Sequence, residues 1–451
     1  MQLLAIVIFV IVCYCAIRDF KRTVLIWMPV QFLFNSMIAL RYYSPGVALN
    51  IGMNIALFCI YFVKCRGKER KMNMNTDDFL FFPLLCLQLV SFFFSMLTAI
   101  VPFSAGLTAS IKFFVTNFAT LYLYQKVLND EKDIRLFVRT SLVVIFMITL
   151  LGVYESVMHD NPWLDIVYLY SPHDESTHGR MWYTPPFVSR AGDVRIRYGM
   201  VRAYSFMGIH IAFGVACLFF LYMILTILKN GWNFGVKKNT LVIAAILLVA
   251  GIFCANSKTG MVGLVFLLLG FVKTKYLINP KIFVPFFLVV IAIIVFMPDY
   301  LNNYISLFDE SVAEEGGGST IALRENQAKV AMKLFYMNPA FGNGMGSIDI
   351  MKQVGTNSDI LGAESAYLRI LPERGILGIV VYLLGYLIYF NVMRRYVPAK
   401  EAFFFLLSLF VMEAATGLMD TSWYGAIVLA VRRCYQLSKN RKILDRVQTT
   451  D

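Results

Sequence analysis

The feature that most constrains this chain is a succession of apolar runs, each near the length that crosses a bilayer. A membrane helix needs about 17–25 predominantly apolar residues. Such runs predict spans near 1–17, 24–40, 47–63, 78–101, 109–128, 136–158, 204–228, 240–256, 260–276, 282–298, 375–393 and 400–419, with a shorter candidate at 422–435. We therefore predict an all-α polytopic membrane protein with about 12–13 transmembrane helices.

The composition excludes a water-soluble fold of this length. The 451 residues are 59% hydrophobic and 15% charged, with a mean hydropathy of +0.66. Soluble domains average about 45–50% apolar and about 25% charged residues, so lipid must cover the excess apolar surface. The first run lacks the basic leader and the small-residue cleavage site of a signal peptide, and we interpret it as the first span.

The net charge of +13 would suit a nucleic-acid-binding protein, but its distribution argues for a membrane topology. Lys and Arg are concentrated in alternate connections, namely 18–22, 64–71, 126–139, 229–238, 273–281, 394–400 and 432–446. The positive-inside rule places these connections in the cytoplasm. The N-terminus is then outside and the C-terminus inside, and we expect membrane lipids, and no nucleic acid, as partners.

This topology leaves two long segments outside the membrane. The chain divides into N-terminal spans at 1–158, a first outer loop at 159–203, central spans at 204–298, a second outer loop at 299–374, and C-terminal spans with a cytoplasmic tail at 375–451. Long loops in compact folds are commonly functional. In the second loop the apolar spacing predicts a helix over 320–337, and a shorter helix from Ala363 that continues through Gly375 into the next span.

Metal and cofactor motifs are weak. None of the eight cysteines lies in a long outer loop, and none has zinc-site spacing. His173, Asp174, Glu175 and His178 are metal-binding residue types, but their spacing suits neither a helical nor a hairpin zinc site. The glycines at 342–346 follow no strand, which argues against a dinucleotide loop. We expect no metal and no cofactor.

Four patches together resemble a known family. They are Arg202-Ala-Tyr-Ser-Phe-Met-Gly208, Asn256-Ser-Lys-Thr-Gly-Met261, Arg324 followed by Asn338-Pro-Ala-Phe-Gly-Asn-Gly-Met-Gly346, and Gly362-Ala-Glu-Ser-Ala-Tyr-Leu-Arg-Ile-Leu-Pro-Glu-Arg-Gly-Ile-Leu-Gly378. Over roughly residues 200–420, their order resembles the O-antigen ligase and O-antigen polymerase superfamily. That pattern has a Ser-Arg-Thr-Gly hairpin, an outer loop with Arg and Pro-x-x-Gly-x-Gly-x-Gly, then His-Asn-x-x-Leu and a Gly-Ile/Leu-x-Gly helix start.

The resemblance implies a metal-independent, membrane-embedded glycosyltransferase of the C type. Such an enzyme acts on undecaprenyl-diphosphate-linked glycans at the outer face of the bacterial inner membrane. Here Lys258 replaces the hairpin Arg, and Glu364 stands where ligases have His. Both departures favour a polymerase, because superfamily polymerases vary more at these positions.

We therefore predict polymerisation of lipid-linked oligosaccharide units into O-antigen, capsule or exopolysaccharide, with a chain-length regulator as a candidate partner. One alternative is a ligase that moves the glycan onto lipid A-core or protein. Another, from a different class, is a flippase or transporter of the lipid-linked unit. A transporter should show inverted repeats or broken helices near the middle of the membrane, and the sequence shows neither clearly.

The predicted catalytic residues follow from the chemistry that the resemblance implies. A leaving diphosphate needs cations in a site of low dielectric, and Arg324 and Lys258 are the candidates. The acceptor hydroxyl needs a base within hydrogen-bond reach, and Glu364 is the candidate. Plain alternatives remain: Lys258 as a snorkelling helix-end cation, Arg324 as an ordinary helix charge, and Glu364 as a carboxylate that favours the helix dipole.

The predicted substrate-binding residues are Arg202, His210, Arg195, Arg197 and Arg369. His210 lies within a predicted span, where an ionisable residue suggests function. Lipid-headgroup contact is the alternative for Arg195 and Arg197, and an i,i+4 ion pair with Glu373 is the alternative for Arg369. Glu413 and Asp420, near the twelfth span, are either intramembrane functional acids or hydrogen-bond partners.

Overall fold

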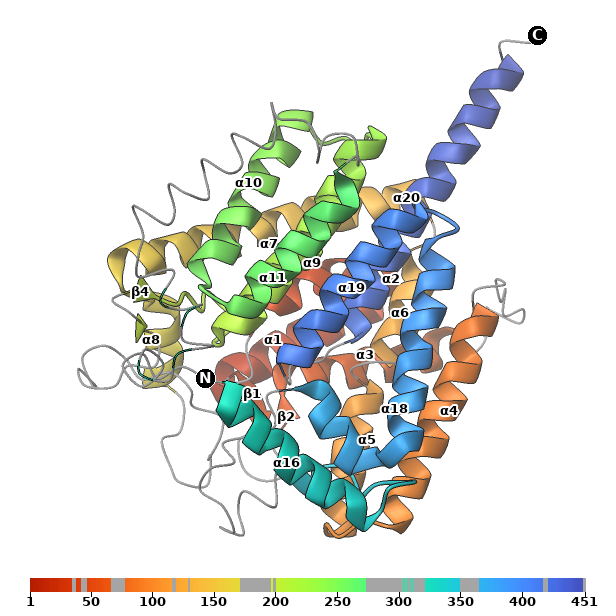
Figure 1. Ribbon diagram of the computed structural model, residues 1–451. Helices are drawn as coiled ribbons and strands as arrows, with labels where there is room; N and C mark the ends of the chain where they lie inside the picture. The colour runs from red at the N-terminus through yellow and green to blue at the C-terminus, as the bar shows by residue number, and fades with distance from the viewer. Residues whose placement is uncertain are drawn as a thin grey trace.

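The computed structural model is a bundle of helices with two short antiparallel strand pairs (Figure 1). It describes residues 1–34, 38–41, 47–65, 78–115, 119–128, 130–170, 196–197, 200–272, 321–348, 365–416 and 421–448, together with isolated positions between 302 and 311. The helices of the N-terminal part are α1 (Gln2–Arg18), α2 (Phe20–Val30), η1 (Gln31–Leu33), α3 (Leu49–Cys65), α4 (Asp78–Leu97), α5 (Phe103–Phe114), α6 (Thr120–Val127), α7 (Glu131–Met158) and α8 (Pro162–Leu169).

The helices of the C-terminal part are α9 (His210–Asn230), α10 (Lys238–Cys254), α11 (Lys258–Phe271), α16 (Ile321–Met337), α18 (Ala366–Met393), α19 (Ala399–Ala415) and α20 (Thr421–Gln448). Strand β1 (Ala39–Arg41) pairs with β2 (Val47–Ala48), and β3 (Ile196–Arg197) pairs with β4 (Met200–Val201). In Figure 1 the last turns of α20 project beyond the bundle, at the end opposite to α16.

Three of the described helices are long and apolar enough to cross a membrane: α7, α9 and α18. Shorter apolar helices lie at Gln2–Arg18, Leu49–Lys64, Cys86–Leu97, Lys238–Cys254 and Lys258–Phe271. This arrangement is consistent with the predicted polytopic helical membrane protein. The number of spans and the likeness to C-type glycosyltransferases stay predictions, and the predicted span 282–298 lies outside the described residues.

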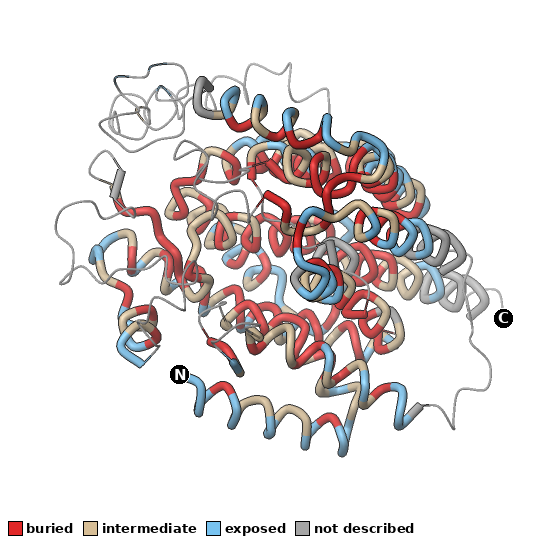
Figure 2. The backbone as a smooth tube through the Cα atoms, turned by 90° about the horizontal axis from the view of Figure 1, so that it is seen from below, coloured by how far each residue is buried: buried red, intermediate tan, exposed pale blue. Residues whose placement is uncertain are grey.

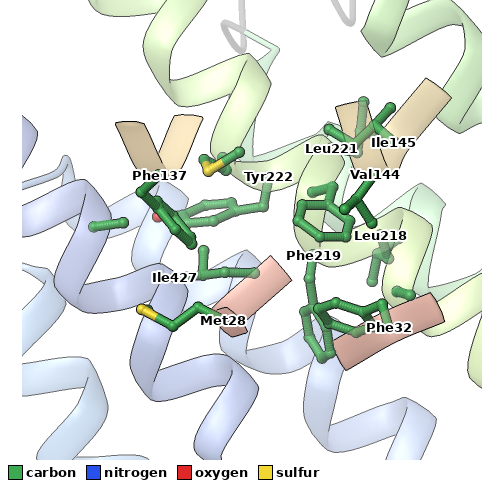
Figure 3. Close-up of a cluster of buried hydrophobic side chains, with 14 of the residues drawn as sticks. Met28, Phe32, Phe137, Val144, Ile145, Leu218, Phe219, Leu221, Tyr222 and Ile427 are labelled. Atoms are coloured by element: carbon green, nitrogen blue, oxygen red, sulfur yellow. The ribbon is translucent and has the colours of Figure 1, made fainter. Parts of the chain in front are cut away.

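The core of the bundle forms where α2, α7, α9 and α20 meet. Figure 3 shows Met28, Phe137, Tyr222 and Ile427 packed together from these four helices. The described chain also exposes large apolar side chains on its periphery, including Val10 of α1, Leu150 of α7 and Leu387 of α18. Figure 2 shows buried residues concentrated inside the bundle and exposed ones on its outer helices. Such an apolar exterior is the surface that a bilayer covers.

Most predicted span positions are helical, but the predicted span at 24–40 is wrong at its end. The α-helix stops at Val30, and residues 39–41 form a strand. Gln31 donates through Nε2 to Met28 O (3.1 Å), so a side chain satisfies a carbonyl at the helix end. The predicted helix over 320–337 is confirmed as α16, from Ile321 to Met337.

The segment predicted as the first outer loop contains a helix, α8, that the apolar spacing did not predict. Asn161 caps α8, because its side chain accepts a hydrogen bond from Leu164 N (3.0 Å), and Pro162 occupies the first turn. An Asn-Pro pair is a recognised helix-start signal. The signal was present in the sequence and was missed.

Candidate functional site

The hairpin between α10 and α11 carries Lys258 at the first position of α11. Asn256 makes the turn with φ of 43°, and Ser257 Oγ caps α11 by accepting from Gly260 N (3.4 Å). Asn256 and Ser257 are buried, whereas Lys258 is half-buried. A cation at a helix N-terminus is unfavourable to the helix dipole, so helix stability does not explain Lys258.

Arg202 and His210 lie against this hairpin. The backbone N–H of Ala203 donates to Cys254 O (2.9 Å), which joins the segment after β4 to the end of α10. Arg202 Nη1 and His210 Nε2 are 3.0 Å apart, and the Tyr204 ring stacks on the His210 ring at 5.7 Å. The structure therefore brings Arg202 and His210 together, as neighbours of the hairpin that carries Lys258.

The packing of α11 on α19 sets the position of Lys258 along the bundle. Gly270 lies against Glu401, and Gly263 lies against Met412. Ser408 Oγ also donates to Gly263 O (2.8 Å). The two helices are thus antiparallel, and extending this register by five residues places Lys258 level with the C-terminal end of α19.

Arg324 reaches the same end of α19. Its Nη1 and Nη2 both donate to Ala415 O, each at 3.4 Å, from the first part of α16. The adjacent carboxylate, Glu325, is exposed and pairs with Lys329 at 2.9 Å. The hydrogen bond from Lys329 and its charge lower the pKa of the Glu325 carboxyl. The carboxylate next to Arg324 in the sequence is therefore paired with Lys329, one turn further along α16.

The start of α18 also meets the end of α19. Ala366 N donates to Thr416 O (3.2 Å), and Ser365 is the N-cap of α18. Figure 1 shows α16 along the lower edge of the bundle, beside the lower part of α18, against which it packs. Glu364 itself lies outside the described residues, although its neighbour Ser365 is placed at this junction.

The glycine-rich loop after α16 crosses α18 at a kink. Gly375 has φ of 64° and ψ of −161°, and Ile376 N donates to Pro339 O (2.9 Å). A Cβ on Gly375 would lie 2.5 Å from Ala340 O, and one on Gly342 (φ 80°) would lie 2.4 Å from Arg374 N. Two backbones touch here, which only glycine permits. The predicted short helix is observed from Ala366, and it leads through the kink at Gly375 into a helix long and apolar enough to cross a membrane.

Asn343 fixes this loop from inside. Its side chain is fully buried, and its Nδ2 donates to Leu334 O (2.7 Å) and to Pro372 O (3.2 Å). Asn338 Nδ2 in turn donates to the Asn343 Oδ1 (2.8 Å). The loop is thereby bound both to the helix that carries Arg324 and to the first segment of α18.

Arg369 forms the predicted ion pair with Glu373, with Nε and Oε1 3.2 Å apart. Glu373 is buried and also accepts from Gly346 N (2.9 Å). The pair therefore holds the glycine-rich loop, which supports the structural interpretation of Arg369. Substrate binding by Arg369 stays a prediction.

Arg374 is a buried cation that the sequence analysis did not single out. It is 1% exposed, its Nη1 donates to Gln88 Oε1 (2.5 Å), and its guanidinium lies 4.9 Å and 5.3 Å from the Phe92 and Phe113 ring centres. It joins α18 to α4 and α5. Its only signal in the sequence was a charge beside an apolar run, which does not indicate its partners.

Glu413 is a hydrogen-bond partner within the bundle. It is 1% exposed and accepts from Tyr382 OH (2.8 Å) and Tyr367 OH (3.4 Å). This observation favours the structural alternative for Glu413. Asp420 lies outside the described residues.

Other predicted site positions are only partly described. Arg195 lies outside the described residues, and the backbone of Arg197 pairs in β3 with Met200 of β4. The cluster from His173 to His178 also lies outside them. In the part of the chain that is described, no group of three His, Cys, Asp or Glu side chains is arranged to hold a metal.

Comparison with known proteins supports the resemblance in the sequence. Residues 243–383 match the family model described as O-antigen ligase. The matched range includes Lys258, Arg324, Glu364 and Arg369, and it ends within α18. It is shorter than the resemblance over roughly 200–420, and Arg202, His210 and α19 lie outside it. No curated protein matches the chain.

Proposed function

From the O-antigen ligase match over residues 243–383, we propose that this chain polymerises undecaprenyl-diphosphate-linked oligosaccharide units at the outer face of the bacterial inner membrane. Members of the family are membrane enzymes that transfer glycans as ligases or polymerases. The product would be O-antigen, capsule or exopolysaccharide. The donor is the growing lipid-linked chain, and the acceptor is a hydroxyl of a fresh lipid-linked unit.

The observation that carries the proposal is the meeting of three elements at the C-terminal end of α19. Arg324 binds Ala415 O, Ala366 N binds Thr416 O, and the α11 register brings Lys258 level with both. Two cations and the chain next to Glu364 thus lie at one end of the bundle. This is the combination that transfer from a diphosphate requires, since developing negative charge is stabilised by fixed cations in a site of low dielectric.

In the proposed step, the acceptor hydroxyl oxygen attacks the anomeric carbon of the donor sugar. The new glycosidic bond forms while the bond from that carbon to the diphosphate oxygen breaks, and undecaprenyl diphosphate leaves. The hydroxyl proton passes to the Glu364 carboxylate. Arg324 and Lys258 stabilise the charge on the departing diphosphate, for which Arg is suited by its bidentate contacts.

Arg324→Ala tests the role of the cation. With purified protein and lipid-linked repeat unit, we expect the rate of undecaprenyl diphosphate release to fall about 10²–10³-fold, the usual effect of losing one transition-state donor. Lys333→Ala is the matched control, because Lys333 is an exposed cation on the same helix. A wild-type rate in the Arg324→Ala enzyme would remove Arg324 from the reaction.

Glu364→Gln tests the base. Gln retains the shape of the side chain but cannot accept the proton, so the rate should fall about 10²–10⁴-fold while donor binding persists. Glu364→His should restore part of the activity, since the family's ligases have His at this position. Wild-type polymerisation by Glu364→Gln would assign the base to another group.

A ligase remains the second candidate, because the matching family model is described as O-antigen ligase. The acceptor separates the two functions. A polymerase extends lipid-linked units into a ladder when no other acceptor is present, whereas a ligase releases lipid diphosphate only when lipid A-core or an acceptor protein is supplied. A single product on lipid A-core, without a ladder, would replace the polymerase proposal.

A further inference from the structure

Glu155 is a buried carboxylate that the proposed reaction does not use. It lies in the last turn of α7 and is fully buried. Its Oε2 accepts three hydrogen bonds: from Tyr204 N (2.8 Å), Ser205 N (2.8 Å) and Asn161 Nδ2 (2.7 Å). An ionisable residue within an apolar helix is costly and commonly functional.

The Glu155 carboxylate holds the chain segment that follows Arg202. Two of its three donors are the backbone N–H groups of Tyr204 and Ser205. Ser205 adopts φ of 51° and donates through Oγ to Ile148 O (2.6 Å). A non-glycine residue with positive φ persists where its surroundings force that conformation, and Glu155 supplies two of the hydrogen bonds that do so.

This segment determines where Arg202 and His210 lie. Tyr204 stacks on the His210 ring, and His210 lies 3.0 Å from the Arg202 guanidinium. Ala203 N binds Cys254 O at the α10–α11 hairpin. The segment thus bridges the end of α7 and the hairpin that carries Lys258, with Glu155 as its anchor on the α7 side.

We infer that Glu155 is a positioning residue, which places the Arg202–His210 pair at the hairpin so that Arg202 can bind the donor diphosphate. The inference rests on the proposed function for the identity of that ligand. Glu155 itself is fully buried and binds backbone, so it acts through Arg202 rather than on the substrate.

The first experiment measures position without activity. The chain has four histidines, and modification of His210 by diethylpyrocarbonate can be followed by mass spectrometry. Glu155→Ala should expose His210 and raise its modification rate several-fold. Glu401→Ala is the matched control, because Glu401 is also a buried carboxylate but pairs with Lys229 elsewhere in the bundle. An unchanged His210 rate in Glu155→Ala, or an equal rise in Glu401→Ala, would overturn the inference.

The second experiment is a double-mutant cycle on donor kinetics. Glu155→Ala should raise the donor KM about tenfold or more, whereas Glu155→Gln, which keeps an acceptor oxygen, should stay within about threefold of wild type. In an Arg202→Ala background, Glu155→Ala should have no further effect. Multiplying effects would show that Glu155 does not act through Arg202.

The two hypotheses fail in different ways. Wild-type kinetics for Arg202→Ala would overturn the inferred binding of the donor diphosphate by Arg202, yet would leave the proposed function, which rests on Arg324, Lys258 and Glu364, intact. Unchanged modification of His210 in Glu155→Ala would remove the positioning role, whatever the rate of polymer synthesis.

Discussion

Replacing Gly375 with alanine tests the crossing that joins the glycine-rich loop to α18. Gly375 has φ of 64° and ψ of −161°, a region that residues other than glycine rarely adopt. The added Cβ would also lie 2.5 Å from Ala340 O and 2.6 Å from Pro339 O. These neighbours are backbone atoms, so they cannot turn aside as a flexible side chain does.

The cost has two parts. The unfavourable backbone conformation costs about 1–3 kcal/mol. To relieve the clash, the two backbone segments must move apart. They are joined by two hydrogen bonds, from Ile376 N to Pro339 O (2.9 Å) and from Leu377 N to Ala340 O (3.2 Å). Each such hydrogen bond contributes about 0.5–1.5 kcal/mol. We therefore expect a total destabilisation of about 2–6 kcal/mol.

Thermal unfolding of the purified protein in detergent measures this cost. With about 2.1 cal/mol/K of unfolding entropy per residue, a 451-residue chain loses about 1 °C of Tm per kcal/mol. Gly375→Ala should therefore lower Tm by about 2–6 °C. Gly231→Ala is the matched control, because Gly231 has φ of 63° but no neighbour within 4 Å of an added Cβ. It should cost about 1 °C, and equal shifts for the two variants would refute the backbone crossing.

Two further predictions concern the buried cation and the topology. Arg374→Met should destabilise the protein by about 2–5 kcal/mol in the same unfolding assay. The substitution leaves the buried Gln88 amide oxygen without its donor and removes two cation–π contacts. An unchanged Tm would show that Arg374 is not a link between α18 and α4. In a cysteine-free background, Lys333→Cys should react with an impermeant thiol reagent in intact spheroplasts, whereas Lys439→Cys should react only after lysis. Both positions are exposed, and they lie on opposite sides of the membrane in the predicted topology. The reverse pattern would invert the topology and exclude the proposed outer active site.

The sequence by itself determined the class of this protein and the places of its main helices. Apolar runs of membrane length predict helices because the bilayer offers no partner for backbone N–H and C=O groups, so each run must satisfy them internally. The same local reasoning predicted the helix at 320–337, observed as Ile321–Met337, and the ion pair between Arg369 and Glu373 at i,i+4 spacing. The family motif predicts a role for Lys258 and Arg324, and both lie within residues 243–383, which match the family model.

The tertiary structure alone decided which of these residues meet. Lys258 and Arg324 are far apart in the chain. Close packing of Gly263 and Gly270 of α11 on α19 brings Lys258 level with the C-terminal end of α19, and Arg324 donates to Ala415 O at that same end. Two of the three donors to the buried Glu155 carboxylate, Tyr204 N and Ser205 N, lie 49 and 50 residues away in the sequence. Helix periodicity reports which face of a helix is apolar, but the partner of each face is set by packing between elements distant in sequence, and that information is not local.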